Sequence, residues 1–362
     1  MLGVQPECKL LQFKRYIAGI LLTCALAAND SVFAQSAPEA EKQNPQATIQ
    51  DLVWPPPPLD PRIRYLRSIS NPDDIGRKKG FWRRAWEFIR GPEAELSMIK
   101  PMSVAVDPLG RLFVADPSAV RVHVFDEKEA DYQSIALIGD TPLKHPISVT
   151  VDNAGNIYIA DSLLASVFML SPELELMKVF GEDGALQRPT GMAVDSAQGF
   201  LYVVDTPEHQ IKVFDIKKGI WDNAIGQRGT GKGEFNYPTF VATDSRGRIY
   251  ITDSLNHRIQ IFDRQGFYVA SFGKVGDAPG DIRAPKDIAL DSDGHIYVAD
   301  AVFDNIQIFD DSGQLLLFWG GTGQDEGRFW LPTGVFIAGD DKIYVADSYN
   351  SRVQVFQYLS KE

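Results

Sequence analysis

The chain has 362 residues, of which 44% are apolar and 23% charged, the usual balance of a water-soluble globular protein. Its formal net charge is −12. Because affinity for nucleic acids depends on neutralising phosphates with basic side chains, a nucleic acid is not an expected partner. Thirty glycines and 22 prolines favour many short strands joined by turns over a few long helices.

The first segment, 1–34, has the layout of a signal peptide. A basic pair at 14–15 precedes an apolar run, and the motif Val32-Phe33-Ala34 that follows has the pattern of a cleavage site. The run is too short for a membrane span, which needs about 20 apolar residues. We therefore expect cleavage near Ala34 and a periplasmic or secreted protein. Lipid attachment at Cys24 is the alternative.

Export would remove both cysteines, Cys8 and Cys24, so disulfides, thiolate catalysis and cysteine metal ligands are not expected. The remaining chain has 33 basic and 46 acidic residues, a net charge of −13. Its first part, 35–60, is predicted to be a linker. A polar, disordered stretch comes first, and Val53-Trp-Pro-Pro-Pro-Pro-Leu59 then forms an extended polyproline spacer.

A strand is expected at 62–70, where apolar and polar side chains alternate. The next segment, 71–100, contains a helical pattern at 77–90, with aromatic side chains on one face and basic side chains on the other. Aromatic and arginine side chains often carry the energy of protein interfaces. The expected partner-binding residues are Phe81, Trp82, Arg83, Arg84, Trp86 and Arg90.

Six similar units fill the rest of the chain. Each contains an aromatic residue, two small or apolar residues and an Asp, and the Asp positions recur every 44–48 residues: Asp116, Asp161, Asp205, Asp253, Asp300 and Asp347. Each unit has the alternation of four antiparallel strands, and this period is typical of propeller blades. We predict an all-β, six-bladed β-propeller at 61–362, with four-stranded antiparallel blades and one inserted amphipathic helix.

The two ends of the propeller are predicted to close on each other. The sixth unit stops after its third strand, 352–356, and lacks a fourth. The early strand at 62–70 can supply it, which would remove an open edge that is otherwise prone to aggregation.

Two of the units resemble the NHL-repeat family: Asp253-Ser-Leu-Asn-His-Arg-Ile-Gln-Ile-Phe262 and Asp347-Ser-Tyr-Asn-Ser-Arg-Val-Gln-Val-Phe356. On this resemblance, which extends over about 62–358, the chain is identified as an exported, bacterial-type member. The resemblance implies the propeller fold and leaves function open. The family includes RNA-binding modules, protein-interaction modules and a zinc-dependent lyase that cleaves peptidyl-hydroxyglycine.

The residue after the proline that opens each unit tests the lyase, because the metal-binding histidines of that family follow this proline. None of the six is His: Met102, Ile147, Thr190, Thr239, Lys286 and Thr333. The five histidines occupy unlike points of their units. A catalytic zinc needs three protein ligands. We therefore expect no zinc site and name no catalytic residue.

The polar members of this set, Thr190, Thr239, Lys286 and Thr333, are expected to surround one mouth of the central channel. They would hold water there, or a small anion at Lys286. The repeated Asp residues are expected to cap loop backbones, as Asp does in turns, rather than to form a ring of ligands.

Three interpretations of 77–90 stay open: a helix packed on the propeller, a docking element for an acidic protein or an anionic membrane surface, and a lid facing Trp330, Trp319 and Phe303. We predict a non-catalytic scaffold that docks a protein or surface partner at the channel mouth through this helix, without a cofactor. The alternative is a lactonase-like hydrolase or lyase with a metal, such as calcium, in the channel. The oligomeric state is left open.

Overall fold

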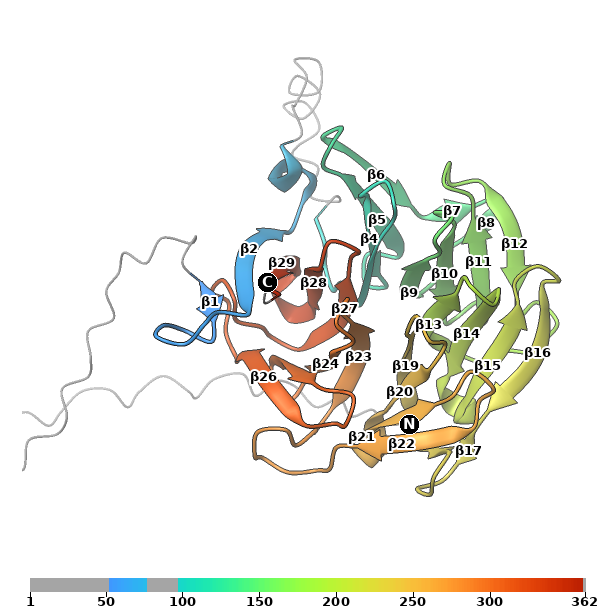
Figure 1. Ribbon diagram of the computed structural model, residues 1–362. Helices are drawn as coiled ribbons and strands as arrows, with labels where there is room; N and C mark the ends of the chain where they lie inside the picture. The colour runs from blue at the N-terminus through green and yellow to red at the C-terminus, as the bar shows by residue number, and fades with distance from the viewer. Residues whose placement is uncertain (1–51, 77–96, 361–362) are drawn as a thin grey trace, which may run out of the picture. The chain divides into compact units, whose positions relative to one another are not determined.

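A computed structural model describes residues 52–76 and 97–360. The predicted signal peptide, most of the predicted linker and the predicted helix at 77–90 lie outside these residues. The described part forms a closed ring of six blades, each a sheet of antiparallel strands (Figure 1). The predicted six-bladed, all-β propeller is confirmed. The described residues include no helix long and apolar enough to cross a membrane.

Each blade runs outward from the channel in chain order. The strands of blades 1 to 3 are β3 (Ser103–Val106), β4 (Leu112–Asp116), β5 (Arg121–Asp126) and β6 (Asp131–Ile135); β9 (Pro146–Val151), β10 (Ile157–Asp161), β11 (Ser166–Leu170) and β12 (Leu176–Phe180); and β13 (Pro189–Asp195), β14 (Phe200–Asp205), β15 (Gln210–Asp215) and β16 (Ile220–Ile225).

Blades 4 to 6 repeat this order, except that the last blade draws its outer strands from the start of the described chain. Their strands are β19 (Pro238–Thr243), β20 (Ile249–Asp253), β21 (Arg258–Phe262) and β22 (Tyr268–Phe272); β23 (Pro285–Leu290), β24 (Ile296–Asp300), β25 (Asn305–Phe309) and β26 (Leu315–Gly320); and β27 (Pro332–Ile337), β28 (Lys342–Asp347), β29 (Arg352–Tyr358), β2 (Ile63–Ile69) and β1 (Val53–Trp54).

Short elements fill the connections between these strands. Two small ladders lie in the loops that join blades, and single turns of 3-10 helix follow several strands. These elements are β7 (Leu137–Ile138), β8 (Thr141–Pro142), β17 (Gln227–Arg228), β18 (Glu234–Phe235), η2 (Pro72–Ile75), η4 (Thr206–Glu208), η5 (Ser254–Asn256) and η6 (Ser348–Asn350).

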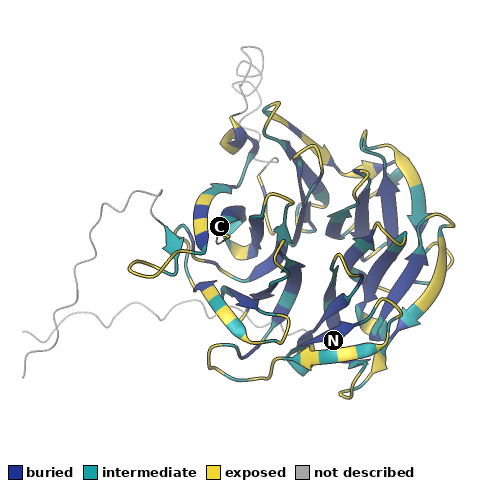
Figure 2. Ribbon diagram, in the orientation of Figure 1, coloured by how far each residue is buried: buried dark blue, intermediate teal, exposed yellow. Residues whose placement is uncertain are grey.

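The hydrophobic core lies between neighbouring blades. The second strands, such as β24, are buried along their whole length, because both of their faces are covered by adjacent blades (Figure 2). The outer strands alternate between partly buried and exposed side chains, as in β26. One cluster shows the principle: Tyr250 and Ile261 of blade 4 pack with Ile296 and Val298 of blade 5. Face-to-face packing therefore explains why the aromatic-Val-Ala-Asp motif is apolar up to its Asp.

The ring closes through β2, which pairs antiparallel with β29 from Ile63 opposite Tyr358 to Ile69 opposite Val353. The predicted closure is confirmed. The structure differs from the predicted spacer at its start, because Val53–Trp54 pairs with β2 as a fifth strand. The Trp54 ring packs edge-on against Phe356, with centroids 5.9 Å apart, and this apolar contact holds the short strand on the blade.

Candidate functional site

The six repeated Asp residues are structural caps. Each is fully buried. Asp161 illustrates the pattern: it accepts from the backbone N–H groups of Lys144 (2.6 Å) and His145 (2.8 Å) before the first strand, and from Leu163 and Leu164 (3.0 Å each) after the second. The carboxylate thus ties together two loops of one blade. The predicted cap of the following loop is confirmed for Asp116, Asp161 and Asp300. Asp205, Asp253 and Asp347 do not cap that loop and accept instead from backbone N–H groups of the loop that enters their blade, as the other three also do.

Most of the predicted channel-mouth residues connect neighbouring blades. The hydroxyl of Thr190 donates to the carbonyl oxygen of Thr239 (2.9 Å), and that of Thr239 donates to the carbonyl oxygen of Lys286 (3.0 Å). Thr333 donates in the same way to Pro101 of blade 1 (3.1 Å). These hydroxyls therefore link the first strands of neighbouring blades through hydrogen bonds.

Lys286 differs from the threonines at the same repeat position. Its side chain is partly buried, and burial lowers the pKa of its ammonium group, which the charge of Asp300 partly offsets. Within 52–76 and 97–360, no carboxylate forms an ion pair with it and no acceptor is hydrogen-bonded to it. Among the four predicted mouth residues, it is therefore the one whose polar group, the ammonium group, has no hydrogen-bond partner in the described chain and is available to a ligand.

The histidines of the described chain do not converge. Each is held by a neighbour of its own: for example, the Nδ1 atom of His209 accepts from the backbone N–H of Tyr237 (3.1 Å), and that of His257 lies 2.7 Å from the carbonyl oxygen of Arg283. Among the described residues, no group of three His, Cys, Asp or Glu side chains could hold a metal ion.

The second residue after each opening proline lies at the start of the first strand, and four of the six, Ser103, Ser148, Phe240 and Asp287, line the channel cavity. In blade order these residues are Ser103, Ser148, Gly191, Phe240, Asp287 and Gly334. The two glycines allow first strands to approach closely: a Cβ on Gly191 would lie 2.5 Å from the Cα of Phe240, and one on Gly334 would lie 2.8 Å from the carbonyl oxygen of Met102. Only blade 5 places a charged side chain at this position.

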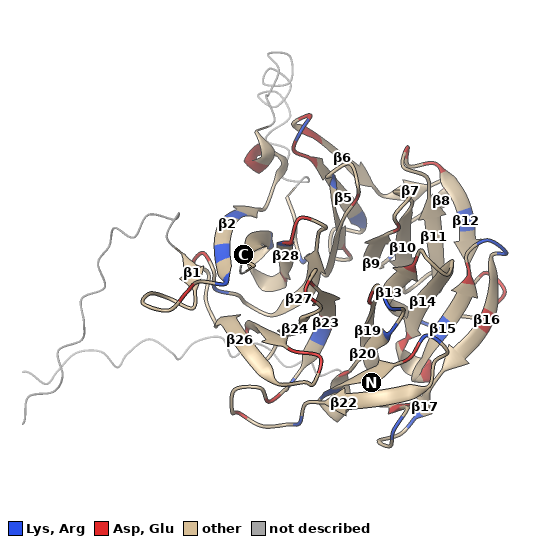
Figure 3. Cartoon of the chain, in the orientation of Figure 1, with Lys and Arg blue, Asp and Glu red and all other residues tan. Residues whose placement is uncertain are grey.

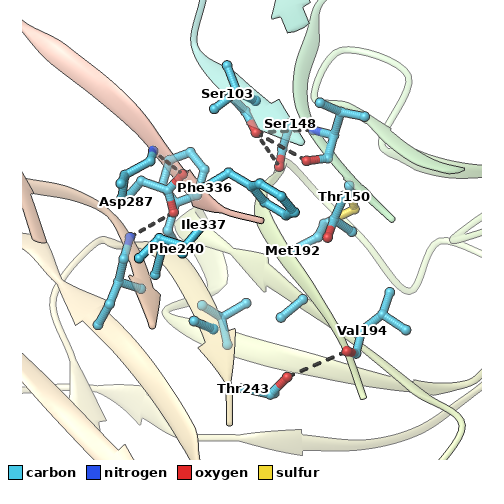
Figure 4. A pocket seen from close by; sticks show the side chains of 18 of the residues that line it. Ser103, Ser148, Thr150, Met192, Val194, Phe240, Thr243, Asp287, Phe336 and Ile337 are labelled. Carbon is cyan, nitrogen blue, oxygen red and sulfur yellow. Dashed lines mark hydrogen bonds between the residues drawn. The ribbon is translucent and has the colours of Figure 1, made fainter. Parts of the chain in front are cut away.

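Asp287 lines a cavity of about 200 Å³ in the channel (Figure 4). The hydroxyls of Ser103, Ser148 and Thr150 and the side chains of Met192, Phe240 and Phe336 line it as well. The lining residues at the beginning of the first strands are buried, whereas Thr150, Thr243 and Leu290, near the ends of these strands, are partly exposed. The cavity is therefore blind near Asp287 and opens on the face where the first strands end.

Asp287 is only 6% exposed. It accepts from two backbone N–H groups, that of Ile288 (2.7 Å) and that of Val335 in the next blade (3.1 Å). Burial raises the pKa of Asp287 to about 8, and these two hydrogen bonds only partly oppose the rise. No Lys, Arg or His in the described part of the chain forms an ion pair with it.

The opposite face carries the loops that enter each blade and those that follow each second strand; we call it the rim. Several large apolar side chains on the rim are 43–63% exposed: Leu163, Tyr237, Leu255, Val302, Trp330 and Tyr349. The rings of Trp330 and Tyr349 lie 5.7 Å apart, and the ammonium group of Lys100 lies 4.4 Å from the Tyr349 ring. Blades 6 and 1 thus share an aromatic patch.

The predicted partner-binding residues Phe81, Trp82, Arg83, Arg84, Trp86 and Arg90 lie outside the described residues. Of the three side chains predicted to face them, Trp330 is exposed on the rim. Trp319 is not available there, because it is buried in the core, where its ring packs edge-on against Phe356. The prediction for Trp319 is therefore wrong, since β26 directs this side chain toward the neighbouring blade.

Sequence reasoning missed Asp287. The signal was present: aligning the second residue after each opening proline shows one charged residue among Ser, Gly and Phe. The repeated Asp residues drew attention because they occur six times, whereas Asp287 stands out because it occurs once.

Comparison with known proteins identifies the repeats. The family model "NHL repeat" matches residues 186–214, 235–262 and 329–356. These segments belong to blades 3, 4 and 6.

Two curated relatives match part of the propeller. The brain tumor protein of Drosophila melanogaster is 36% identical over 99 residues, which are 26% of this chain and 9% of that protein. NHL repeat-containing protein 2 of Gallus gallus is 33% identical over 93 residues, which are 23% and 13% of the two chains. The matches thus span a small part of these relatives' length.

Among solved structures, virginiamycin B lyase from Staphylococcus aureus is similar in fold. Its TM-score is 0.54 at 13% identity, and the match covers 72% of this chain and 95% of the lyase. At this identity the likeness shows the propeller fold alone.

Proposed function

Because the chain is a six-bladed propeller that carries NHL repeats, we propose that it is a non-catalytic binding module that docks a protein partner on the rim. In this proposal the protein is exported, as its first 34 residues suggest, and acts in the periplasm or outside the cell.

The observation that carries the proposal is the apolar patch on the rim. Large exposed apolar side chains are ordinary when scattered, but contiguous ones mark interaction sites. Trp330 and Tyr349 form such a pair, and Lys100 joins them from the neighbouring blade. Tryptophan and tyrosine are also the residue types that most often dominate binding energy at protein interfaces.

The family supports a protein partner in general terms, because NHL-repeat proteins often mediate protein interactions. The matched repeats form 9% and 13% of the two relatives above, as expected of a module reused in larger proteins. Neither relative identifies the partner of this chain.

The insertion that carries the predicted helix adjoins the same region. Its described end is fixed where the backbone N–H of Met98 donates to the carbonyl oxygen of Ser70 (3.1 Å), directly before the exposed Ile99. We therefore keep Trp82, Trp86 and the arginines of 77–90 as proposed anchors beside the patch. Contact with a membrane surface is the competing use of these basic residues.

The test is a binding measurement with two matched variants. A partner is first captured with the full exported chain, and its affinity for the purified protein is then measured. Trp330→Ala combined with Tyr349→Ala is expected to weaken binding about tenfold or more, with little loss of stability, because both side chains are exposed.

Phe267→Ala is the control, because Phe267 is 70% exposed and lies in the turn between β21 and β22, away from the rim. It should bind as the unchanged protein does. If the double variant and Phe267→Ala weaken binding to the same extent, or if neither weakens it, docking on the rim is contradicted. If the protein binds bare anionic vesicles as tightly as it binds the captured partner, the membrane is favoured as the target.

The metal-dependent alternative has one observation in its favour, the buried carboxylate of Asp287 in the channel. Calcium takes six to eight oxygen ligands, usually with several carboxylates. Asp287 supplies one, and the described residues supply no cluster of three metal-ligating side chains. We therefore rank a metal-dependent hydrolase or lyase second.

A further inference from the structure

We propose that the channel cavity beside Asp287 is a binding site for a small organic molecule carrying a primary ammonium group. This site goes beyond the docking function, because the cavity opens on the face opposite to the rim and no rim residue lines it.

The first argument is the missing counter-charge. A buried carboxylate is normally paired, since desolvation disfavours a lone charge. Asp287 has only two backbone N–H groups, one on each oxygen. Each oxygen keeps lone-pair capacity beyond these two bonds, because an ionised carboxylate accepts about four hydrogen bonds. Burial disfavours the ionised form of Asp287 as long as no counter-charge is present. An ammonium group at the blind end of the cavity would favour that form and would provide the missing donors.

The second argument is the chemistry of the lining. Figure 4 shows Ser103 and Ser148 on one side of the cavity and Asp287 on the other, and Phe336 and Phe240 also line the cavity. Small-molecule sites are typically apolar, with a few convergent polar groups that fix orientation. Aromatic faces also attract ammonium groups. One charge, a few hydroxyls and aromatic walls fit an amine better than a bare metal ion, which needs several oxygen ligands.

The third argument is the charge at the entrance. A cleft of about 570 Å³ between blades 4 and 5 abuts the channel cavity, and Thr243 and Leu290 line both. The cleft is lined by two arginines, one histidine and five aspartates: Asp244, Asp291, Asp293, Asp310 and Asp311. Figure 3 marks acidic residues in red on several turns of the ring.

Two of the five aspartates are paired with a basic side chain. The Nε atom of Arg248 donates to Asp244 (2.7 Å), and the Nδ1 atom of His295 lies 2.8 Å from an oxygen of Asp291. The remaining carboxylates leave the entrance negative, so it would raise the local concentration of cations.

The size of the cavity limits the ligand. At about 200 Å³ it is smaller than the roughly 300–1,000 Å³ of sites for drug-sized molecules. The fitting class is therefore a short amine of a few heavy atoms, such as an amino alcohol whose hydroxyl reaches Ser103 or Ser148.

The experiment measures the melting temperature of the full exported chain against ethanolamine, 1,4-diaminobutane, 1,4-butanediol, sodium chloride and calcium chloride at constant ionic strength. A ligand that binds only the folded state must raise the melting temperature. We expect a rise with one or both amines that grows with the logarithm of amine concentration, and none with the uncharged diol. Asp287→Asn should need about tenfold or more amine to reach the same rise.

Asp311→Asn is the matched control, because it removes the same charge from an exposed position in the cleft and leaves the channel intact. It should show the same rise with amine concentration as the unchanged protein. A calcium response that depends on Asp287, without an amine response, would overturn the ligand class. The proposal also fails if the protein responds to neither amine, or if amines and the diol act alike. The amine and diol comparison needs only the unchanged protein, so it holds even if a variant folds poorly.

Discussion

Two kinds of buried aspartate distinguish the loop layer of this propeller from its channel. In the loops, six aspartates are fully buried, and each accepts from one or two backbone N–H groups of the loop that enters its blade, as Asp161 does from two. In the channel, Asp287 accepts from two backbone N–H groups, faces a cavity and has no counterpart in the other blades. An aspartate repeated in every blade therefore indicates a requirement of the fold, whereas Asp287, which occurs in one blade, indicates a binding site.

The largest effect should come from removing an element that the repeat requires. Deleting residues 61–70 removes β2, the strand that completes blade 6, and exposes the edge of β29. An open edge strand is a template for aggregation. We expect aggregated material in size-exclusion chromatography, whereas a monodisperse deletion variant with a cooperative thermal transition would contradict closure through β2.

The next largest effect should come from substituting one of the repeated aspartates. Asp253→Ala removes the acceptor for the backbone N–H of Asn236 (2.7 Å) and for the Nε atom of Arg258 (2.8 Å), and so leaves a largely buried guanidinium group without its carboxylate. The expected loss of unfolding free energy is about 3–5 kcal/mol. Urea denaturation measures it.

Asp205 is the internal comparison, because it accepts from the backbone N–H groups of Gln187 and Arg188 without a basic partner. Asp205→Ala should cost less, about 1–3 kcal/mol for the stranded donors. If Asp253→Ala is nearly neutral, the repeated carboxylates are not the structural caps described above.

Much of the fold could be predicted from the sequence because it repeats. Regular spacing of Asp116 through Asp347 indicated six blades, and the missing fourth strand of the last unit indicated closure by 62–70. The strand at Val53–Trp54 was missed, because its stability comes from contacts with distant parts of the chain, such as that between Trp54 and Phe356. Local composition, dominated by proline, suggested a spacer instead.

The candidate site was harder to predict, since its parts come from every blade. In the sequence, Thr190 and Thr239 look like ligand-binding residues. In the structure, their hydroxyls instead donate hydrogen bonds that link the first strands of neighbouring blades. Asp287 looks like one of many aspartates, and only the ring geometry places it in the channel opposite Ser103 and Ser148. Contacts across the axis are not encoded by any local pattern.

The most direct test of the contrast between repeated and single aspartates is the pH dependence of stability of the unchanged protein and of Asp287→Asn. The pKa of Asp287 in the folded state is about 8, above its ordinary value of 3.8, because of burial. Between these values the folded chain holds a proton that the unfolded chain has released, so this group makes stability fall as pH rises. Asp287→Asn removes the effect.

We therefore predict that urea denaturation will show Asp287→Asn to be increasingly more stable than the unchanged protein from about pH 4 to pH 8, by a few kcal/mol at the upper end. Such a result would establish an unpaired buried carboxylate in the channel. A difference that stays constant with pH, or a variant that is less stable at pH 8, would mean that Asp287 is satisfied as the repeated aspartates are, and would contradict the account.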